Sequence, residues 1–136
     1  MSHTDEIKTA WVTRSKTVSK KPWGHEKSWS SFTAGHGKIL SINKGSRTSL
    51  KYNPQKNESL FVLTGKLRVT FGDELSIKHP ASHPMKIETL EPGECLNVQS
   101  CCPYRLEALE DSEVVEIGNF LSDKPVRIED DYGRAN

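Results

Sequence analysis

The sequence lacks a long apolar run, an excess of one charge and a regular set of cysteines. No apolar stretch approaches the ~20 residues that span a bilayer, and residues 1–21 lack the apolar core of a signal peptide. Nineteen basic residues oppose eighteen acidic ones, and a formal net charge of +1 gives no electrostatic case for binding nucleic acid or an anionic membrane. We therefore expect a soluble, cytoplasmic protein with neither kind of partner.

The cysteines are too few and too irregular for a disulfide framework. Cys95, Cys101 and Cys102 are odd in number, and two of them are adjacent. Disulfide frameworks use evenly numbered, spaced cysteines, so reduced thiols are the better interpretation. No second Cys/His pair stands at the spacing of a zinc site either.

Short alternating segments between turn residues fill the rest of the chain. At 136 residues it is long enough for one domain with a single core. The strongest signal is "ESLFVLTGKLRVTFGDE", residues 58–74, which predicts two strands joined at Gly65. No 3.6-residue period lasts long enough for a substantial helix, so the pattern predicts an all-β sandwich or barrel. Further strands are expected within residues 38–45, 47–52, 85–99 and 104–120, and residues 127–136 are expected to be irregular.

The strand order, the spacing from Gly45 to Gly65 and the later "EPGE" turn resemble the cupin superfamily. The flanks "KPWGHEKSW" and "VRIEDDYGR" resemble the isomerase domain of bifunctional type II mannose-6-phosphate isomerase/mannose-1-phosphate guanylyltransferase. The resemblance runs from about residue 21 to residue 134. It implies a single-domain cupin, a double-stranded β-helix of jelly-roll type at residues 21–134, preceded by a polar N-terminal arm at residues 1–20.

The same resemblance implies a metal site whose ligands are mostly replaced here. Laid on this sequence, its ligand positions fall on Lys51, Asn53, Glu58 and Tyr104, of which Glu58 alone is a usual ligand. An ammonium at residue 51 repels a cation, and the amide and phenol are weak ligands for zinc-type ions. We expect no metal and no other cofactor, with the geometry of the site kept.

Alternation along a strand places Lys51 and Asn53 on one wall, with Arg47 and Ser49 further along it. Two interpretations of this wall stay open. Lys51 and Glu58 form a buried ion pair that fills the pocket of a structural or regulatory module, because buried charges need partners. Alternatively, the side chains at the four ligand positions bind a sugar or sugar phosphate used in activated-sugar or polysaccharide metabolism.

A third interpretation is an active aldose–ketose isomerase of mannose 6-phosphate. Glu58 would then be the catalytic base, and Lys51 would stabilise the enediolate in place of a metal. Arg105 and Arg127 stand where the resembling enzymes have arginines, which implies contact with a sugar phosphate. The resemblance also implies a homodimer.

Overall fold

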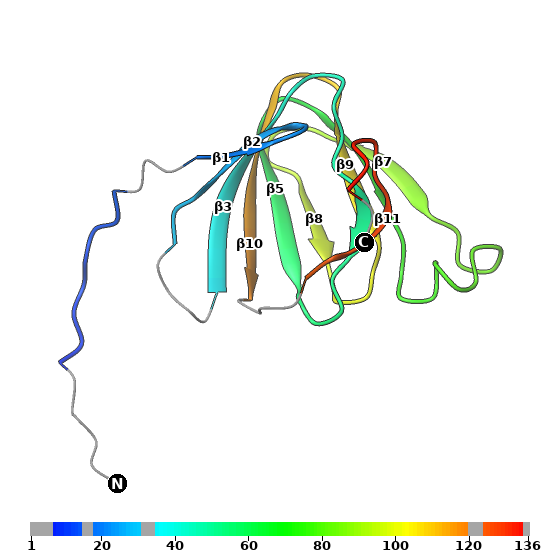
Figure 1. Ribbon diagram of the computed structural model, residues 1–136, viewed down its shortest axis with the longest axis horizontal. Coiled ribbons are helices and arrows are strands. Elements are labelled where there is room, and N and C mark those ends of the chain that lie inside the picture. The colour runs from blue at the N-terminus through cyan, green and yellow to red at the C-terminus, as the bar shows by residue number, and fades with distance from the viewer. Residues whose placement is uncertain (1–6, 15–17, 31–34, 120–123, 135–136) are drawn as a thin grey trace, which may run out of the picture.

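The chain folds as two antiparallel sheets that face each other (Figure 1). The computed structural model describes residues 7–14, 18–30, 35–119 and 124–134. In spatial order, the first sheet contains β1 (Ser19–Lys21), β2 (Gly24–Ser28), β3 (Gly35–Ile42), β10 (Ser112–Asn119), β5 (Glu58–Thr64) and β8 (Cys95–Val98). The second contains β11 (Val126–Glu129), β4 (Leu50–Tyr52), β9 (Tyr104–Ala108), β6 (Leu67–Phe71) and β7 (Lys86–Leu90).

Alternating side chains fill the space between the sheets, as the sequence pattern predicts. On β5, Leu60 and Val62 are buried while Phe61 and Leu63 are exposed on the outer face. Because neighbouring residues of a strand point to opposite faces, each strand contributes every second residue to the core. The buried apolar residues are Trp23, Leu40, Ile42, Leu60, Val62, Leu67, Val69, Leu96, Val98, Tyr104, Leu106, Ala108 and Val114.

The turn between β5 and β6 requires glycine, as the expected hinge at Gly65 suggested. Gly65 has φ 89°, a conformation that residues with a side chain rarely adopt. A Cβ atom there would also lie 2.5 Å from the backbone oxygen of Asp111. The backbone angle and the close approach both exclude other residues at this turn.

The inner face of the first sheet changes from apolar to polar towards one end of the barrel. On β3 the inward residues run from Leu40 to Lys38 and His36. On β10 they run from Val114 to Glu116, and β5 begins at the buried Glu58, followed on the same face by Leu60. Antiparallel pairing places Lys38 opposite Glu116 and Glu58 opposite Gly118, so the polar ends of three strands meet.

Two segments differ from what the sequence pattern predicts. The tail was expected to be irregular, but residues 126–129 form β11, an edge strand that pairs with β4. The end of the expected N-terminal arm, residues 19–20, belongs to β1, which forms a hairpin with β2. Both strands are short and rich in polar residues. Neither therefore shows a clear alternating pattern in the sequence.

The N-terminal segment leaves the barrel as an extended chain. Residues 7–14 contain no strand and are exposed, and Figure 1 shows them running away from the two sheets. Across the described ranges, no helix has the length and apolar character needed to cross a membrane.

Candidate functional site

A cavity of about 300 Å³ opens at the polar end of the barrel. This volume lies at the lower end of the range of small-molecule sites, ~300–1,000 Å³. Eight of its ten lining residues carry charge. The lining residues are Lys21, Glu26, Lys38, Lys51, Asn53, Lys56, Glu58, Glu116, Pro125 and Arg127.

Three strands of the second sheet place two cationic side chains that line this cavity next to a buried aromatic ring. The pairing register aligns Arg127 of β11 with Lys51 of β4, and Lys51 with Tyr104 of β9. The Lys51 ammonium lies 5.9 Å from the centre of the Tyr104 ring, within the range of a cation–π contact. Tyr104 is buried, so the wall is anchored to the core on this side.

Glu58 is the centre of a hydrogen-bonded group. Asn53 Nδ2 donates to Glu58 Oε1 at 2.9 Å, and the Tyr104 hydroxyl donates to the same oxygen at 2.8 Å. Lys56 Nζ lies 3.4 Å from the other oxygen, Oε2. Among the described residues, no carboxylate lies within 4.0 Å of the Lys51 ammonium, so the Lys51–Glu58 ion pair of the first interpretation is not formed.

A second carboxylate, Glu116 of β10, lies beside Glu58. His36 Nε2 is 2.8 Å from Glu116 Oε2, and Lys56 Nζ is 3.9 Å from the same oxygen. Lys56 therefore lies between the two carboxylates. Lys56, and not the Lys51 of one sequence interpretation, is therefore the lysine that pairs with Glu58.

The two carboxyl groups have different acidities because their neighbours differ. Burial, and then the charge of Glu116, raises the pKa of Glu58 despite the nearby lysines. Burial also opposes ionisation of Glu116, but the His36 hydrogen bond and the nearby lysines outweigh it and lower its pKa to about 2. Glu116 is therefore the fixed negative charge, while Glu58 is the carboxyl that can take up a proton.

Burial also shifts the two other titratable groups of this wall. It lowers the pKa of Lys51, against the attraction of Glu116 and Glu58. Burial and the same two carboxylates raise the pKa of Tyr104 well above its ordinary value. Tyr104 therefore stays a hydroxyl donor, and Lys51 is less strongly basic than a solvated lysine.

Charge is graded along the cavity. The side chains of Glu58 and Glu116 are 2% and 8% exposed, whereas those of Lys38 and Lys21 are 29% and 34% exposed. Glu26 lies between these two lysines, 3.3 Å and 3.6 Å from their ammonium groups. The two buried carboxylates therefore lie deep in the cavity with Lys51 and Lys56, while Lys38 and Lys21 lie nearer its mouth.

The four positions of the resembling metal site do not fit a metal ion. The side chains of Asn53 and Tyr104 direct donors, not lone pairs, at the one remaining ligand, Glu58. Lys51 adds a positive charge beside them. Cations require several deprotonated or neutral donor atoms, which these residues do not present.

A different trio could hold a metal by residue type. One ligand atom from each of His36, Glu58 and Glu116 lies within 4.8 Å of the others. The ammonium of Lys56 lies 3.4 Å and 3.9 Å from the two carboxylates and already provides the positive charge they need. A metal ion here would have to displace Lys56.

The structure gathers five of the six residues proposed from sequence and leaves one elsewhere. Lys51, Asn53, Glu58 and Arg127 line the cavity, and Tyr104 contacts two of them. Arg105 follows Tyr104 on β9 and therefore points to the outer face, where its Nε donates to the Thr48 backbone oxygen.

Arg47 also departs from the expected wall, because β4 begins only at Leu50. It forms an ion pair with Asp131 on the outer face of the sheet.

The cavity residues that sequence reasoning missed lie mostly on the first sheet. They are Lys21, Glu26, His36, Lys38, Lys56 and Glu116, of which His36 reaches the cavity's carboxylates without lining it. Alternation in "SEVVEIGN" does place Glu116 on the same face as Val114. No local pattern pairs that strand with β3, since His36 and Glu116 are 80 residues apart.

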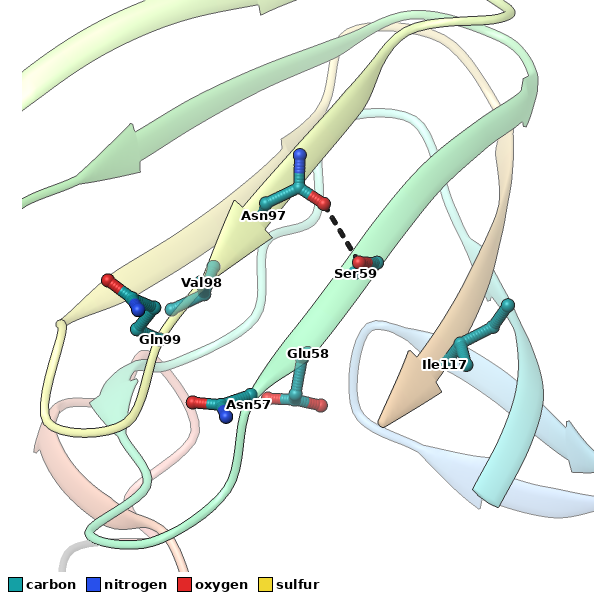
Figure 2. Close-up of a pocket in the computed structure, with 7 residues that line it drawn as sticks. All are labelled: Asn57, Glu58, Ser59, Asn97, Val98, Gln99 and Ile117. Atoms are coloured by element: carbon teal, nitrogen blue, oxygen red, sulfur yellow. Dashed lines mark hydrogen bonds between the residues drawn. The ribbon is translucent and has the colours of Figure 1, made fainter. Parts of the chain in front are cut away.

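A second hollow of about 260 Å³ lies between the ends of β5 and β8 (Figure 2). Its polar lining comes from Asn57, Ser59, Asn97 and Gln99, and Ser59 donates a hydrogen bond to Asn97 Oδ1 at 2.8 Å. Apart from Glu58, its lining residues are uncharged. It lacks the graded charge of the first cavity, which is therefore the candidate site.

Comparison with known proteins finds likeness in structure and none in sequence families. No protein-family model and no curated protein matches the chain. KdgF from Halomonas sp. superposes with a TM-score of 0.68 at 14% identity, covering 83% of this chain and 96% of that one. An RmlC-like cupin from Shewanella frigidimarina gives a TM-score of 0.67 at 8% identity, covering 84% and 94%.

A vicilin from Solanum melongena is a further structural neighbour. It gives a TM-score of 0.58 at 19% identity and covers 69% of this chain but 26% of its own. At these identities the likeness establishes the fold alone. Together with the two facing antiparallel sheets, it shows that the chain has the cupin fold, a single-domain all-β barrel.

Proposed function

We propose that the chain binds a small anionic carbohydrate, a sugar phosphate above all, in the charged cavity and without a metal. The observation that carries the proposal is the excess of positive charge in the lining. The lining contains five cationic side chains and three carboxylates. An anionic ligand would balance this excess, and several donors at one site are the usual means of holding phosphate oxygens.

The grading of charge supports a ligand with two chemically different ends. A phosphate at the mouth would meet Lys38, Lys21 and Arg127. Hydroxyl groups in the interior would donate to Glu116 and Glu58 and accept from Asn53. The vicilin neighbour is described as having different anionic ligands in structurally similar pockets, which agrees with this use of the fold.

Titration calorimetry against a matched set of ligands tests the proposal. The set is mannose 6-phosphate, glucose 6-phosphate, mannose, and inorganic phosphate. We expect saturable heat with a sugar phosphate, weaker binding of inorganic phosphate, and the weakest binding of neutral mannose.

Arg127→Gln is the informative variant, because its guanidinium faces the cavity from β11. A charge-assisted hydrogen bond contributes ~1.5–3 kcal/mol, so its loss should weaken binding roughly tenfold or more. Arg68→Gln is the matched control, since Arg68 pairs with Glu107 on the outer face at 3.1 Å. Absence of saturable heat with every sugar phosphate would refute the proposal.

A second candidate, an aldose–ketose isomerase of mannose 6-phosphate, rests on the two opposed pKa shifts. The pKa of Glu58 is raised and that of Lys51 is lowered, which brings an acid and a base of one cavity closer to neutrality. Glu58 would move the proton between C2 and C1, and Lys51 would stabilise the enediolate oxygen.

Isomerisation has a signature that binding lacks. In D₂O, an active isomerase introduces deuterium at C2 of mannose 6-phosphate, and this is seen by proton NMR. Glu58→Gln should abolish that exchange while sugar phosphate still binds. Binding without any exchange in the wild type would leave the binding function and remove the isomerase.

The proposal includes assembly as a homodimer. Phe61, Leu63 and Ile117 are 39%, 45% and 53% exposed on the outer face of the first sheet. β5 and β10 are neighbours, so these side chains lie near one another on that face. Contiguous exposed apolar surface is typical of protein–protein contacts, and a second copy of the chain would cover it.

A further inference from the structure

One wall of the cavity is formed by the C-terminal strand, which has a single neighbour in its sheet. Within the described ranges, β11 pairs with β4 alone, through Val126 with Tyr52 and Arg127 with Lys51, and its register shifts before Glu129. Such a short edge strand gains little from its own ladder. Its position over the cavity must depend on other contacts.

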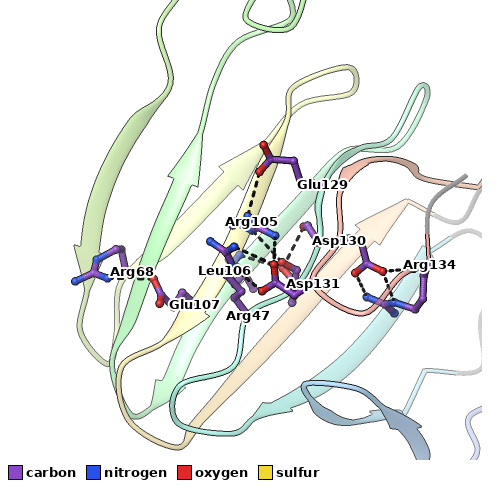
Figure 3. A network of polar contacts seen from close by, with 11 residues as sticks. Arg47, Arg68, Arg105, Leu106, Glu107, Glu129, Asp130, Asp131 and Arg134 are labelled. Carbon is purple, nitrogen blue, oxygen red and sulfur yellow. Dashed lines mark hydrogen bonds and ion pairs between the residues drawn. The ribbon is translucent and has the colours of Figure 1, made fainter.

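Those contacts come from the acidic residues that end β11 and follow it (Figure 3). Arg47 donates to both oxygens of Asp131, at 2.6 Å and 2.9 Å. Arg105 contacts Glu129 at 3.4 Å and Asp131 at 3.8 Å. Bidentate arginine–carboxylate pairs are the most directional of ion pairs, so this cluster fixes the end of the strand.

The two arginines are themselves held by the body of the barrel. Arg105 is 5% exposed, and its Nε donates to the Thr48 backbone oxygen at 3.0 Å. Arg47 forms a backbone bridge with Glu107 of β9. Asp131 contacts both arginines, so its carboxylate reduces the repulsion between the Arg47 and Arg105 guanidinium groups. Asp131 thus stabilises the two arginines, and the two arginines hold Asp131 and the end of β11 in place.

Arg127 is the residue that this arrangement places. It lines the cavity, and its Nε is buried without a hydrogen-bond partner among the described residues. As a lining residue aligned with Lys51, it can donate from its guanidinium to an anionic ligand in the cavity. The cluster on the outer face thus holds the strand that carries Arg127 into the lining of the cavity.

We propose that Arg47 and Arg105 are positioning residues, which clamp Asp131 and so hold Arg127 in the ligand cavity. This inference rests on the proposed sugar-phosphate binding. Arg105, which the sequence interpretation placed in contact with the ligand, instead supports β11. Arg47 has the same supporting role and does not touch the ligand. Binding strength is then set in part by a salt bridge on the opposite side of the sheet.

The test combines Arg47→Gln with Arg127→Gln in a double-mutant cycle. Affinity for mannose 6-phosphate is measured by calorimetry, and opening of the strand by hydrogen–deuterium exchange of the amides at 126–130. Arg47→Gln should speed that exchange and weaken binding roughly five- to tenfold, up to the effect of Arg127→Gln. The double variant should bind no more weakly than Arg127→Gln alone, because the clamp acts through Arg127.

Two further variants separate the clamp from general loss of charge. Arg68→Gln breaks the neighbouring outer-face pair with Glu107 and should alter neither exchange at 126–130 nor affinity. Asp131→Asn, which removes the acid that Arg47 and Arg105 share, should reproduce both effects of Arg47→Gln.

Four other outcomes of these measurements would each refute one part of the proposal. Faster exchange with unchanged affinity refutes the positioning role. An equal loss of affinity in the Arg127→Gln background shows that Arg47 acts by another route, which also refutes it. Unchanged exchange in Arg47→Gln refutes the clamp. A wild type that binds no sugar phosphate refutes the proposed function and the ligand role of Arg127 with it, while the exchange data still decide whether Arg47 and Asp131 hold β11.

Discussion

Replacing Glu116 by glutamine should remove a large part of the acid sensitivity of the fold. The pKa of Glu116 is about 2, against an ordinary value of 4.5. A carboxyl whose pKa is lowered in the folded state contributes stability that is complete above its unfolded pKa and is lost as the pH falls through the folded pKa. The difference corresponds to roughly 3 kcal/mol of unfolding free energy, at ~1.4 kcal/mol for each pH unit.

Urea unfolding at several values between pH 5.5 and pH 2 measures this quantity. The wild type should lose ~3 kcal/mol more than Glu116→Gln over that range. Glutamine keeps the volume of the side chain and can still accept the His36 hydrogen bond, so the variant should fold. Glu88→Gln, at an exposed site on β7, is the control and should follow the wild type. Equal acid losses in the wild type and Glu116→Gln would refute the assignment of Glu116 as the fixed charge.

Glu58 should act with the opposite sign, which sharpens the test. Its pKa is raised in the folded state, so its ionisation opposes folding, and stability falls as the pH rises from the unfolded pKa towards the folded one. The charge of Glu116 is the second-largest cause of that rise. Removing Glu116 should therefore bring the pKa of Glu58 down, which carbon-13 NMR of its carboxyl group can measure.

Three other results are expected. The triple variant Lys51→Gln, Asn53→His, Tyr104→His should bind zinc at micromolar concentration, because it supplies ligands at the spacing of Glu58; a folded variant without zinc affinity would contradict the alignment with the metal-binding cupins. Lys51→Met should weaken sugar-phosphate binding while changing the unfolding free energy by less than ~1 kcal/mol, since Glu58 keeps its other partners; a loss of several kcal/mol would instead support a structural role. Phe61→Ser should shift sedimentation from dimer to monomer, and an unchanged sedimentation coefficient would refute that interface.

The fold could be predicted because its determinants are local. Alternation in residues 58–64 and the glycine at residue 65 are visible in the sequence and define β5 and its turn. Lys51 and Asn53 could be assigned to one face for the same reason, and both line the cavity. Period-2 alternation therefore accounted for the second-sheet wall of the site.

The remaining part of the site depends on pairing between distant strands. β3, β10 and β5 bring His36, Glu116 and Glu58 together, yet His36 and Glu116 are 80 residues apart. Nothing local specifies which strands become neighbours, so these contacts were not predicted. The placement of Arg105 failed for a simpler reason, because it follows Tyr104 directly and adjacent residues of a strand face opposite sides.

The charges of this cavity are better explained by binding than by stability. Buried ion pairs contribute little net stability, since desolvation offsets their attraction, and apolar residues of similar size often stabilise a fold more. Lys56 bridges Glu58 and Glu116, which reduces their repulsion but does not remove the cost of burying them. Lys51 has no carboxylate within 4.0 Å among the described residues, and burial lowers its pKa. The cation–π contact with Tyr104 offsets only part of the cost of burying this ammonium, whereas the proposed anionic sugar would give it a charged partner.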